Sequence, residues 1–176
     1  MAAPRLRDDN FHRTVVLVLE HGEEGAVGVV LNRPSETSLG EIASELGHLA
    51  AAPGFVHVGG PVAPGAAVCL GRSRPGNHEA EGVTALFGRV MSVDLDKGVG
   101  AFGEAVDAIR LFAGYAGWAA GQLEGELEQG GWFVVDRIDE DVFSPTPDRL
   151  WRTVLRRQPL RNLVMLASFP DDPDLN

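Results

Sequence analysis

Four polar side chains have the chemical types that a hydrolytic or group-transfer site needs. His21 and Asn32 each follow an apolar run that predicts a strand, and Ser92 and Asp94 lie at the end of a third such run. A histidine, a hydroxyl and a carboxylate act together only when folding brings them within hydrogen-bond reach. No G-x-S-x-G motif surrounds Ser92, and a histidine at a strand end more often bonds loop backbone. We therefore predict no catalytic residue, and an undiscovered hydrolase or transferase is the last of three hypotheses.

The spacing of metal-ligating residue types disfavours a metal site. The histidines at positions 12, 48, 57 and 78 form neither an H-x-x-x-H nor an H-E-x-x-H motif. The segment DLDKG at 94–98 lacks the glycine and the distal glutamate of a calcium loop. Cys69 is the single cysteine, so the chain forms no internal disulfide and no thiolate cluster. We expect no metal and no cofactor, and a location in the reducing cytoplasm.

A glycine-rich stretch with two tryptophans, GYAGWAAGQLEGELEQGGW at 114–132, is the most unusual feature of the sequence. Each glycine disfavours a helix interior by ~1 kcal/mol relative to alanine. The stretch therefore predicts a strand, then a glycine turn, then a helix that begins near Gly121. The turn lacks the Lys-Ser/Thr pair of a P-loop, and acidic residues follow it, so we predict no phosphate site.

We expect this glycine turn to help form a concave site that binds a protein or small-molecule partner. The identity of that partner, and whether the protein forms oligomers, are beyond the sequence. The turn would meet the ends of the first two strands and the Gly-Gly-Pro turn at 59–61. The candidate binding residues are His21, Asn32, Arg33, Gly59, Gly60, Pro61, Ser92, Asp94, Tyr115, Gly117, Trp118, Gln122 and Glu124. A non-enzymatic binding protein is therefore the leading hypothesis.

Strands and helices interleave irregularly along the chain, which predicts one mixed α/β (α+β) domain over residues 1–170. The acidic, proline-broken end at 171–176 predicts a frayed tail. The expected strands lie at 13–19 and 26–31, which would form a hairpin, and at 55–62, 66–70, 83–93 (one strand, or two with a bend at Gly88), 110–117 and 132–136. The expected helices lie at 38–46, with a Ser38–Glu41 capping box, at 101–109, at 121–129 and at 147–157.

Charge and hydropathy exclude further classes of protein. The formal net charge of −10 disfavours direct DNA binding, which needs a segregated basic face. Such a face could come only from Arg149, Arg152 and Arg156, at helical spacing, with Arg157 and Arg161 nearby. No apolar stretch approaches the ~20 residues that span a bilayer, and the N-terminus lacks the apolar core of a secretory signal. We expect no membrane partner.

Several ordered blocks of the sequence resemble one family over nearly the whole chain. The chain is identified as a member of the bacterial YqgE/AlgH family from NFHRTVVLVLEHGEEGAVGVVLNRP, HVGGPV, SVDLD, GYAGWAAGQLEGELEQGGWFV and FPDDPDLN. The resemblance implies a bifurcated, mostly antiparallel or mixed sheet that forms a pseudo-barrel flanked by helices. It also implies a transcriptional regulator, direct or indirect, as the second hypothesis. Relatives usually begin with a further apolar strand before the equivalent of Ala3-Pro4, so we expect this strand to be shortened here.

Overall fold

The longest strand, β8 (Val106–Ala119), is the central strand of a branched sheet. Along one edge it pairs antiparallel with β5 (Val62–Ser73). Along the other edge it pairs first with β4 (Phe55–Val58), in parallel, and then with β2 (Gly25–Val30), antiparallel. The sheet therefore divides where β8 passes from β4 to β2, and the bifurcation that the resemblance implied is confirmed.

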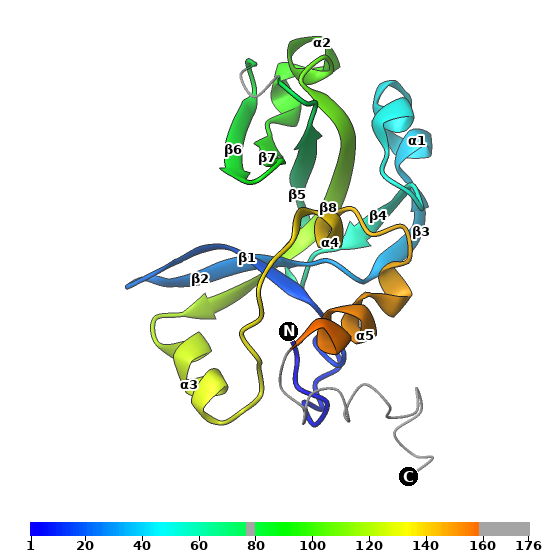
Figure 1. Ribbon diagram of the computed structural model, residues 1–176. Helices are drawn as coiled ribbons and strands as arrows, with labels where there is room; N and C mark the ends of the chain where they lie inside the picture. The colour runs from blue at the N-terminus through cyan, green and yellow to red at the C-terminus, as the bar shows by residue number, and fades with distance from the viewer. Residues whose placement is uncertain (77–79, 159–176) are drawn as a thin grey trace.

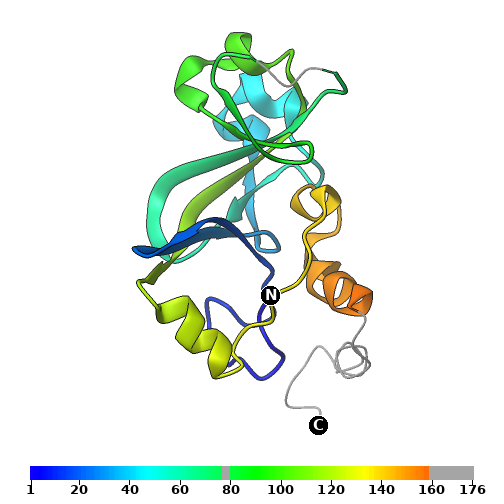
Figure 2. The same ribbon diagram turned by 60° about the vertical axis from the view of Figure 1, so that its left-hand side comes forward.

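The computed structural model describes residues 1–76 and 80–158, and Figures 1 and 2 show its elements. The strand order is β1-β2-β8-β5-β7-β6, and β3 joins the sheet through β4. The other strands are β1 (Val16–Gly22), β3 (Pro34–Ser38), β6 (Val83–Phe87) and β7 (Val90–Val93). The helices are α1 (Leu39–Ile42), α2 (Val99–Phe102), α3 (Gln122–Glu128), α4 (Asp139–Val142) and α5 (Pro147–Arg157), with the 3-10 helices η1 (Ser44–Leu49) and η2 (Leu95–Lys97).

These elements form the predicted mixed α/β single domain, with a curled sheet and several helices around it. Both views place the β1–β2 hairpin and α3 at one end of the molecule (Figures 1 and 2). The β6–β7 hairpin and α2 lie at the opposite end. The predicted tail at 171–176 lies outside the described residues, so the domain boundary stays a prediction.

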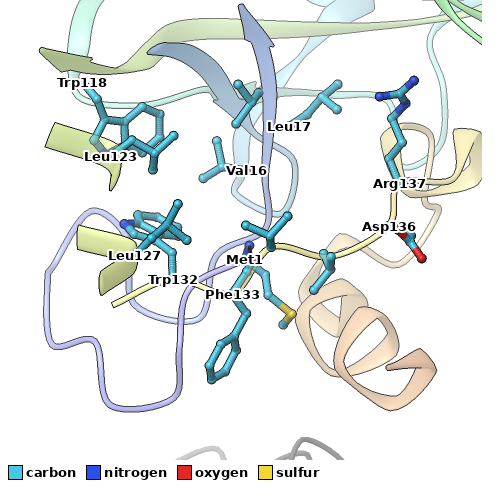
Figure 3. Close-up of a pocket in the computed structure, with 13 residues that line it drawn as sticks. Met1, Val16, Leu17, Trp118, Leu123, Leu127, Trp132, Phe133, Asp136 and Arg137 are labelled. Carbon is cyan, nitrogen blue, oxygen red and sulfur yellow. Dashed lines mark hydrogen bonds between the residues drawn. The ribbon is translucent and has the colours of Figure 1, made fainter. Parts of the chain in front are cut away.

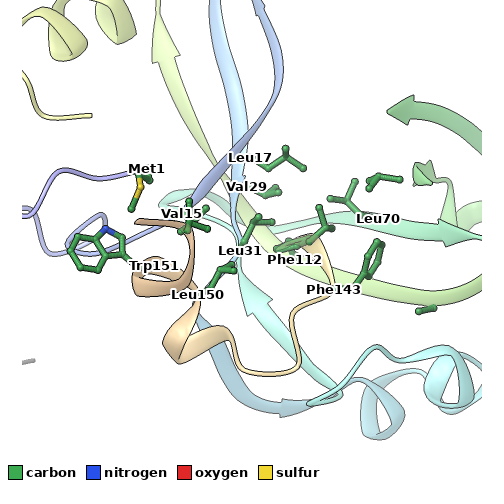
Figure 4. Close-up of a cluster of buried hydrophobic side chains, with 14 of the residues drawn as sticks. Met1, Val15, Leu17, Val29, Leu31, Leu70, Phe112, Phe143, Leu150 and Trp151 are labelled. Atoms are coloured by element: carbon green, nitrogen blue, oxygen red, sulfur yellow. The ribbon is translucent and has the colours of Figure 1, made fainter. Parts of the chain in front are cut away.

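The main core lies where the sheet branches, and helix α5 covers it (Figure 4). Leu31 of the loop after β2 and Phe112 of β8 pack here against Leu150 and Val154 of α5. Helix α5 begins at Pro147 and ends at Arg157, as the sequence predicts, because proline fits the first helical turn and apolar residues recur at helical spacing. Burying a side chain of this size contributes about 1.5–3 kcal/mol, so α5 is fixed mainly through its apolar face.

Two predicted helices differ from the structure because tertiary packing overrides local pattern. The helix predicted at 38–46 ends at Ile42, and Ser38 makes no capping hydrogen bond from its side chain. The chain then turns into η1, which buries Leu46 beside Leu39 and leaves Ile42 57% exposed. Of the helix predicted at 101–109, only its start belongs to α2, because β8 already pairs with β5 at Val106.

The strand predictions are mostly confirmed, with one exception. The first two strands form the predicted antiparallel hairpin, and residues 83–93 form two strands, β6 and β7, rather than one. The strand predicted at 132–136 is wrong, since only Trp132 makes an isolated bridge, with Ala2. The following residues have no strand partner among the described residues. In the described structure, an apolar sequence that favours a strand is therefore left without a neighbouring strand.

Candidate functional site

A groove of about 600 Å³ opens beside the outer edge of β1 (Figure 3). We call it the edge groove, and it is lined by Met1, residues 16–18 of β1, Trp118 of β8, Leu123 and Leu127 of α3, and residues 132–137. Its walls are mainly apolar, and its volume is in the range of ordinary ligand sites. The outer lip is unusually open, since Val134 is 84% and Val18 is 42% exposed.

One wall of the edge groove comes from the glycine turn that the sequence singles out. Strand β8 ends at Ala119, and α3 begins at Gln122. Gly121, the N-cap of α3, has the left-handed conformation (φ 71°), which glycine adopts without steric cost. This turn reverses the chain, so Leu123 and Leu127 pack against the cluster that contains Trp118. The predicted order of strand, turn and helix is confirmed.

The two tryptophans of this wall are held by one carboxylate. The Nε1 groups of Trp118 and Trp132 both donate to Oε2 of Glu126, at 3.1 Å and 2.7 Å. Gln122 donates to the other oxygen at 2.9 Å. Partial burial alone would raise the pKa of Glu126, but the hydrogen bonds from Trp132, Gln122 and Trp118 outweigh it and lower that pKa. The carboxylate therefore stays ionised and fixes both rings, which meet edge to face with centroids 5.7 Å apart.

His21 and Glu124 form a solvated contact near this wall. His21 Nε2 lies 2.5 Å from Glu124 Oε1, and both side chains are about half exposed, at 50% and 49%. A backbone hydrogen bond and then the contact with His21 lower the pKa of Glu124. The pair joins the β1–β2 hairpin to α3, and it can help to fix α3 against the hairpin.

His21 and Asn32 do not share a rim, so this part of the predicted site is wrong. His21 pairs with Ala26 beside the turn of the hairpin, whereas Asn32 lies beyond the other end of β2. At ~3.4 Å per residue the two positions are about 20 Å apart. Asn32 is buried, accepting a hydrogen bond from Val15 N at 2.8 Å and donating to Arg13 O at 2.9 Å. Its role is therefore structural.

Ser92 and Asp94 lie on the far side of the sheet from His21. Ser92 belongs to β7, which the strands β5, β8 and β2 separate from β1. Asp94 caps η2, where its side chain accepts from Asp96 N at 3.0 Å. The structure therefore does not assemble the histidine, serine and aspartate set that a hydrolase or transferase would use.

The Gly-Gly-Pro turn forms a separate, smaller hollow of about 250 Å³. Arg33, Gly60 and Pro61 line it, together with Asp9 and Asn10. Gly59 is needed at this turn for close approach of two backbones, since a Cβ there would lie 2.2 Å from Gly114 O. This turn is thus packed on β8 and does not reach the edge groove.

Tyr115 and Gly117 face the other side of β8 from Trp118, because side chains alternate along a strand. Tyr115 packs against the main core, and Gly117 lies beneath its ring. Of the predicted residues, Trp118 lines the edge groove, and Gln122, Glu124 and His21 flank its wall. The residues predicted to line one groove therefore lie in separate places: some at the edge groove, some at the hollow of the Gly-Gly-Pro turn, and others elsewhere in the fold.

The residues that sequence reasoning missed are the apolar ones at the open lip. In sequence, residues 16–18 have the apolar pattern of an ordinary buried strand, and residues 132–136 have the same pattern. The useful signal was the apolar segment 132–136 itself, which needs a neighbouring strand and finds none among the described residues.

The described parts of the chain lack a metal-ligand cluster and a membrane-spanning helix. These parts contain no group of three or more His, Cys, Asp or Glu side chains that could hold a metal ion. They also contain no helix long and apolar enough to cross a membrane. On α5, Arg149 and Arg156 are exposed, whereas Arg157 pairs with Asp141 at 2.5 Å. Arg161 lies outside the described residues. That the protein does not bind DNA directly stays a prediction, as does the cytoplasmic location.

The fold and the groove define a class of protein: a mixed α/β domain with a branched sheet, an apolar groove at one sheet edge, and the candidate catalytic set dispersed. The sequence profile described as AlgH-like matches residues 1–162. The chain belongs to this AlgH-like family, as its sequence blocks indicate.

Individual relatives agree with this assignment. The UPF0301 protein of Streptomyces coelicolor is 49% identical over all of this chain and 92% of its own length. A crystal structure from Corynebacterium diphtheriae is similar with a TM-score of 0.89 at 33% identity, covering 96% of this chain and 89% of that one. The solution structure of the AlgH protein from Pseudomonas aeruginosa is similar with a TM-score of 0.69 at 29% identity, covering 98% and 92%.

Proposed function

We propose that this protein is a non-enzymatic binding protein and that the edge groove holds an apolar ligand or partner segment. The observation that carries the proposal is an apolar cavity of about 600 Å³ whose tryptophan wall is fixed by Glu126. A pre-organised wall lowers the entropy lost on binding. Val18 and Val134 remain exposed to solvent at the lip, and covering such residues is favourable by ~25 cal/mol per Å².

The dispersion of His21, Ser92 and Asp94 supports binding over catalysis. These side chains lie in strands or turns at opposite ends of the sheet, so no nucleophile contacts a base there. The edge groove itself is lined by a single acidic and a single basic side chain, Asp136 and Arg137. A lining of this kind favours recognition of apolar surface rather than proton transfer.

The test is binding of a neutral fluorescent apolar probe, Nile red, to two variants matched in exposure. Val18→Glu places a charge in the groove on edge strand β1, where Val18 is 42% exposed. Leu86→Glu makes the same change on edge strand β6, where Leu86 is 38% exposed. We expect wild type and Leu86→Glu to bind the probe with the same affinity, and Val18→Glu to bind it at least tenfold more weakly. Equal affinity of the two variants for Nile red would show that the edge groove is not the binding site.

A further inference from the structure

The outer edge of β1 presents backbone groups that pair with no strand of the described structure. Val15 O accepts from Leu31 N at 2.8 Å, which turns residue 15, and by alternation residue 17, toward β2. The N–H and C=O groups of Val16 and Val18 therefore point outward, into the edge groove. In the described residues β1 pairs only with β2.

Residues 134–137, on the other side of the groove, also have backbone groups without a backbone partner in the described part of the chain. Phe133 N donates to Met1 O at 2.8 Å, and Ala3 N donates to Gly131 O at 2.8 Å. Beyond Phe133, the described part of the chain contains no backbone–backbone hydrogen bond to residues 134–137. The groove thus lies between two stretches of main chain that both lack backbone partners among residues 1–76 and 80–158, and one of them is an apolar sequence that predicts a strand.

Backbone of this kind is suited to an extended polypeptide rather than to a compact apolar molecule. An unpaired edge strand is a template for another strand, and proteins usually block such edges with charge, proline or a bulge. The bulge in β1 lies beyond Val18, and its charged residues begin at Glu20, so residues 16–18 are unblocked. An added strand would gain main-chain hydrogen bonds along this edge.

The side chains of the groove suit alternate residues of such a strand. Val16 packs with the tryptophan cluster and points toward Leu123 and Leu127, whereas Leu17 packs into the main core on the other face (Figure 3). An extended occupant beside β1 would therefore place successive side chains against two apolar surfaces.

Charge indicates what flanks the apolar part of the occupant. Past Val18 the hairpin carries Glu20, Glu23 and Glu24, and α3 carries Glu124 and Glu128 on its exposed side. These carboxylates favour lysine or arginine at one end of the occupant. A second copy of this chain, with its own net charge of −10, is repelled by the same charges.

Resting on the proposed function, we infer that the edge groove binds an extended, apolar peptide segment of another polypeptide, with a basic residue at one end, and that this segment adds as a strand to β1. The segment hydrogen-bonds to the outer backbone of Val16 and Val18. Its alternate side chains fill the groove against Leu123 and Leu127. The sheet is thereby extended past its present edge.

The experiment compares two capped peptides of sequence KVLVLVK, one unmodified and one N-methylated at its five central residues. Methylation keeps the apolar side chains but removes the backbone donors. We expect the methylated peptide to bind at least tenfold more weakly to the wild-type protein, measured by calorimetry. In hydrogen exchange, the unmodified peptide should slow exchange of the Val18 amide at least tenfold.

Two variants at one position separate backbone from side-chain effects. Val18→Pro removes an N–H group that does not bond to β2. It should therefore weaken binding of the unmodified peptide at least tenfold, while Nile red still binds. Val18→Thr keeps both the N–H and the branched shape, and it should change peptide affinity less than threefold.

Equal binding of the two peptides to wild type would overturn strand addition and leave the proposed function standing. Failure of both peptides and of Nile red would overturn both proposals. Dimerisation that Val18→Pro abolishes, without peptide binding, would show that a second copy is the occupant and would overturn the peptide assignment.

Discussion

The two ends of β8 differ in how completely the sheet is covered. At one end, which we call the closed end, residues 106–111 pack with α2, η1 and β7 around Phe102, which is fully buried. At the other, the open end, residues 116–119 pair with the β1–β2 hairpin, and α3 covers only part of the hairpin. The edge groove lies at the open end.

The two regions also differ in the hydrogen bonds that their buried polar groups make. Away from the groove, His57 and Arg110 are enclosed so tightly that His57 Nε2 and Arg110 Nε have no hydrogen-bond partner in the described residues. At the open end, Glu126 accepts three side-chain hydrogen bonds. At the groove wall one carboxylate fixes two rings through its hydrogen bonds, whereas at the closed end the hydrogen bonds of Arg72 and Arg89 to Asp107 accompany the apolar packing around Phe102.

The largest expected effect comes from truncating one apolar side chain at each end. Phe102→Ala should lower the free energy of unfolding by about 3–5 kcal/mol, since it leaves a cavity in a closed core. Leu127→Ala removes a side chain that is only partly buried and borders the groove, so it should cost roughly 1 kcal/mol. Urea denaturation measures both. Equal losses would show that the open end is as tightly packed as the closed one.

A smaller effect should follow from pH, through His57. Burial and then the charge of Arg110 lower the pKa of His57 to about 4, from 6.5 in the unfolded chain. The unfolded state therefore binds more protons between these values, and stability is greatest above pH 6.5 and falls as the pH falls toward 4. The loss should be roughly 3 kcal/mol over this window.

Urea denaturation at pH 7.5 and pH 4.5 measures this loss, with His57→Leu as the comparison. The carboxylates titrate in both proteins, so the difference between them isolates the histidine. If the variant lost as much stability as wild type on acidification, His57 would not be the responsible group.

The smallest effect should come from the carboxylate of the groove wall. Glu126→Gln replaces one carboxylate oxygen by an NH2 group and removes the charge, so the indole N–H groups of Trp118 and Trp132, which share Oε2, both lose their charged acceptor. The free energy of unfolding should fall by about 1–3 kcal/mol. Tryptophan fluorescence should change with it, because both rings lose their common anchor. Glu128→Gln on the exposed side of α3 is the matched control and should leave stability and fluorescence unchanged.

Part of the groove could be predicted from the sequence, and part could not. The turn at Gly121 and the approach of α3 to Trp118 follow from glycine chemistry and the spacing of Leu123 and Leu127, which are local. The grouping of His21 with Asn32 failed because both follow a strand, yet in an antiparallel hairpin the ends of successive strands point in opposite directions. The apolar lip at residues 16–18 was missed because an apolar strand gives no sign of whether a neighbour covers its outer edge.

The sequence by itself determined the β1–β2 hairpin, helix α5 and the strand–turn–helix order of β8 and α3, because apolar periodicity, proline and glycine act within a few residues. Only the tertiary structure decided that residues 133–137 find no strand partner in the described chain, and that the outer edge of β1 faces them across a groove. Strand pairing is a contact between distant segments, and which edges stay open depends on how the whole sheet curls and branches around β8.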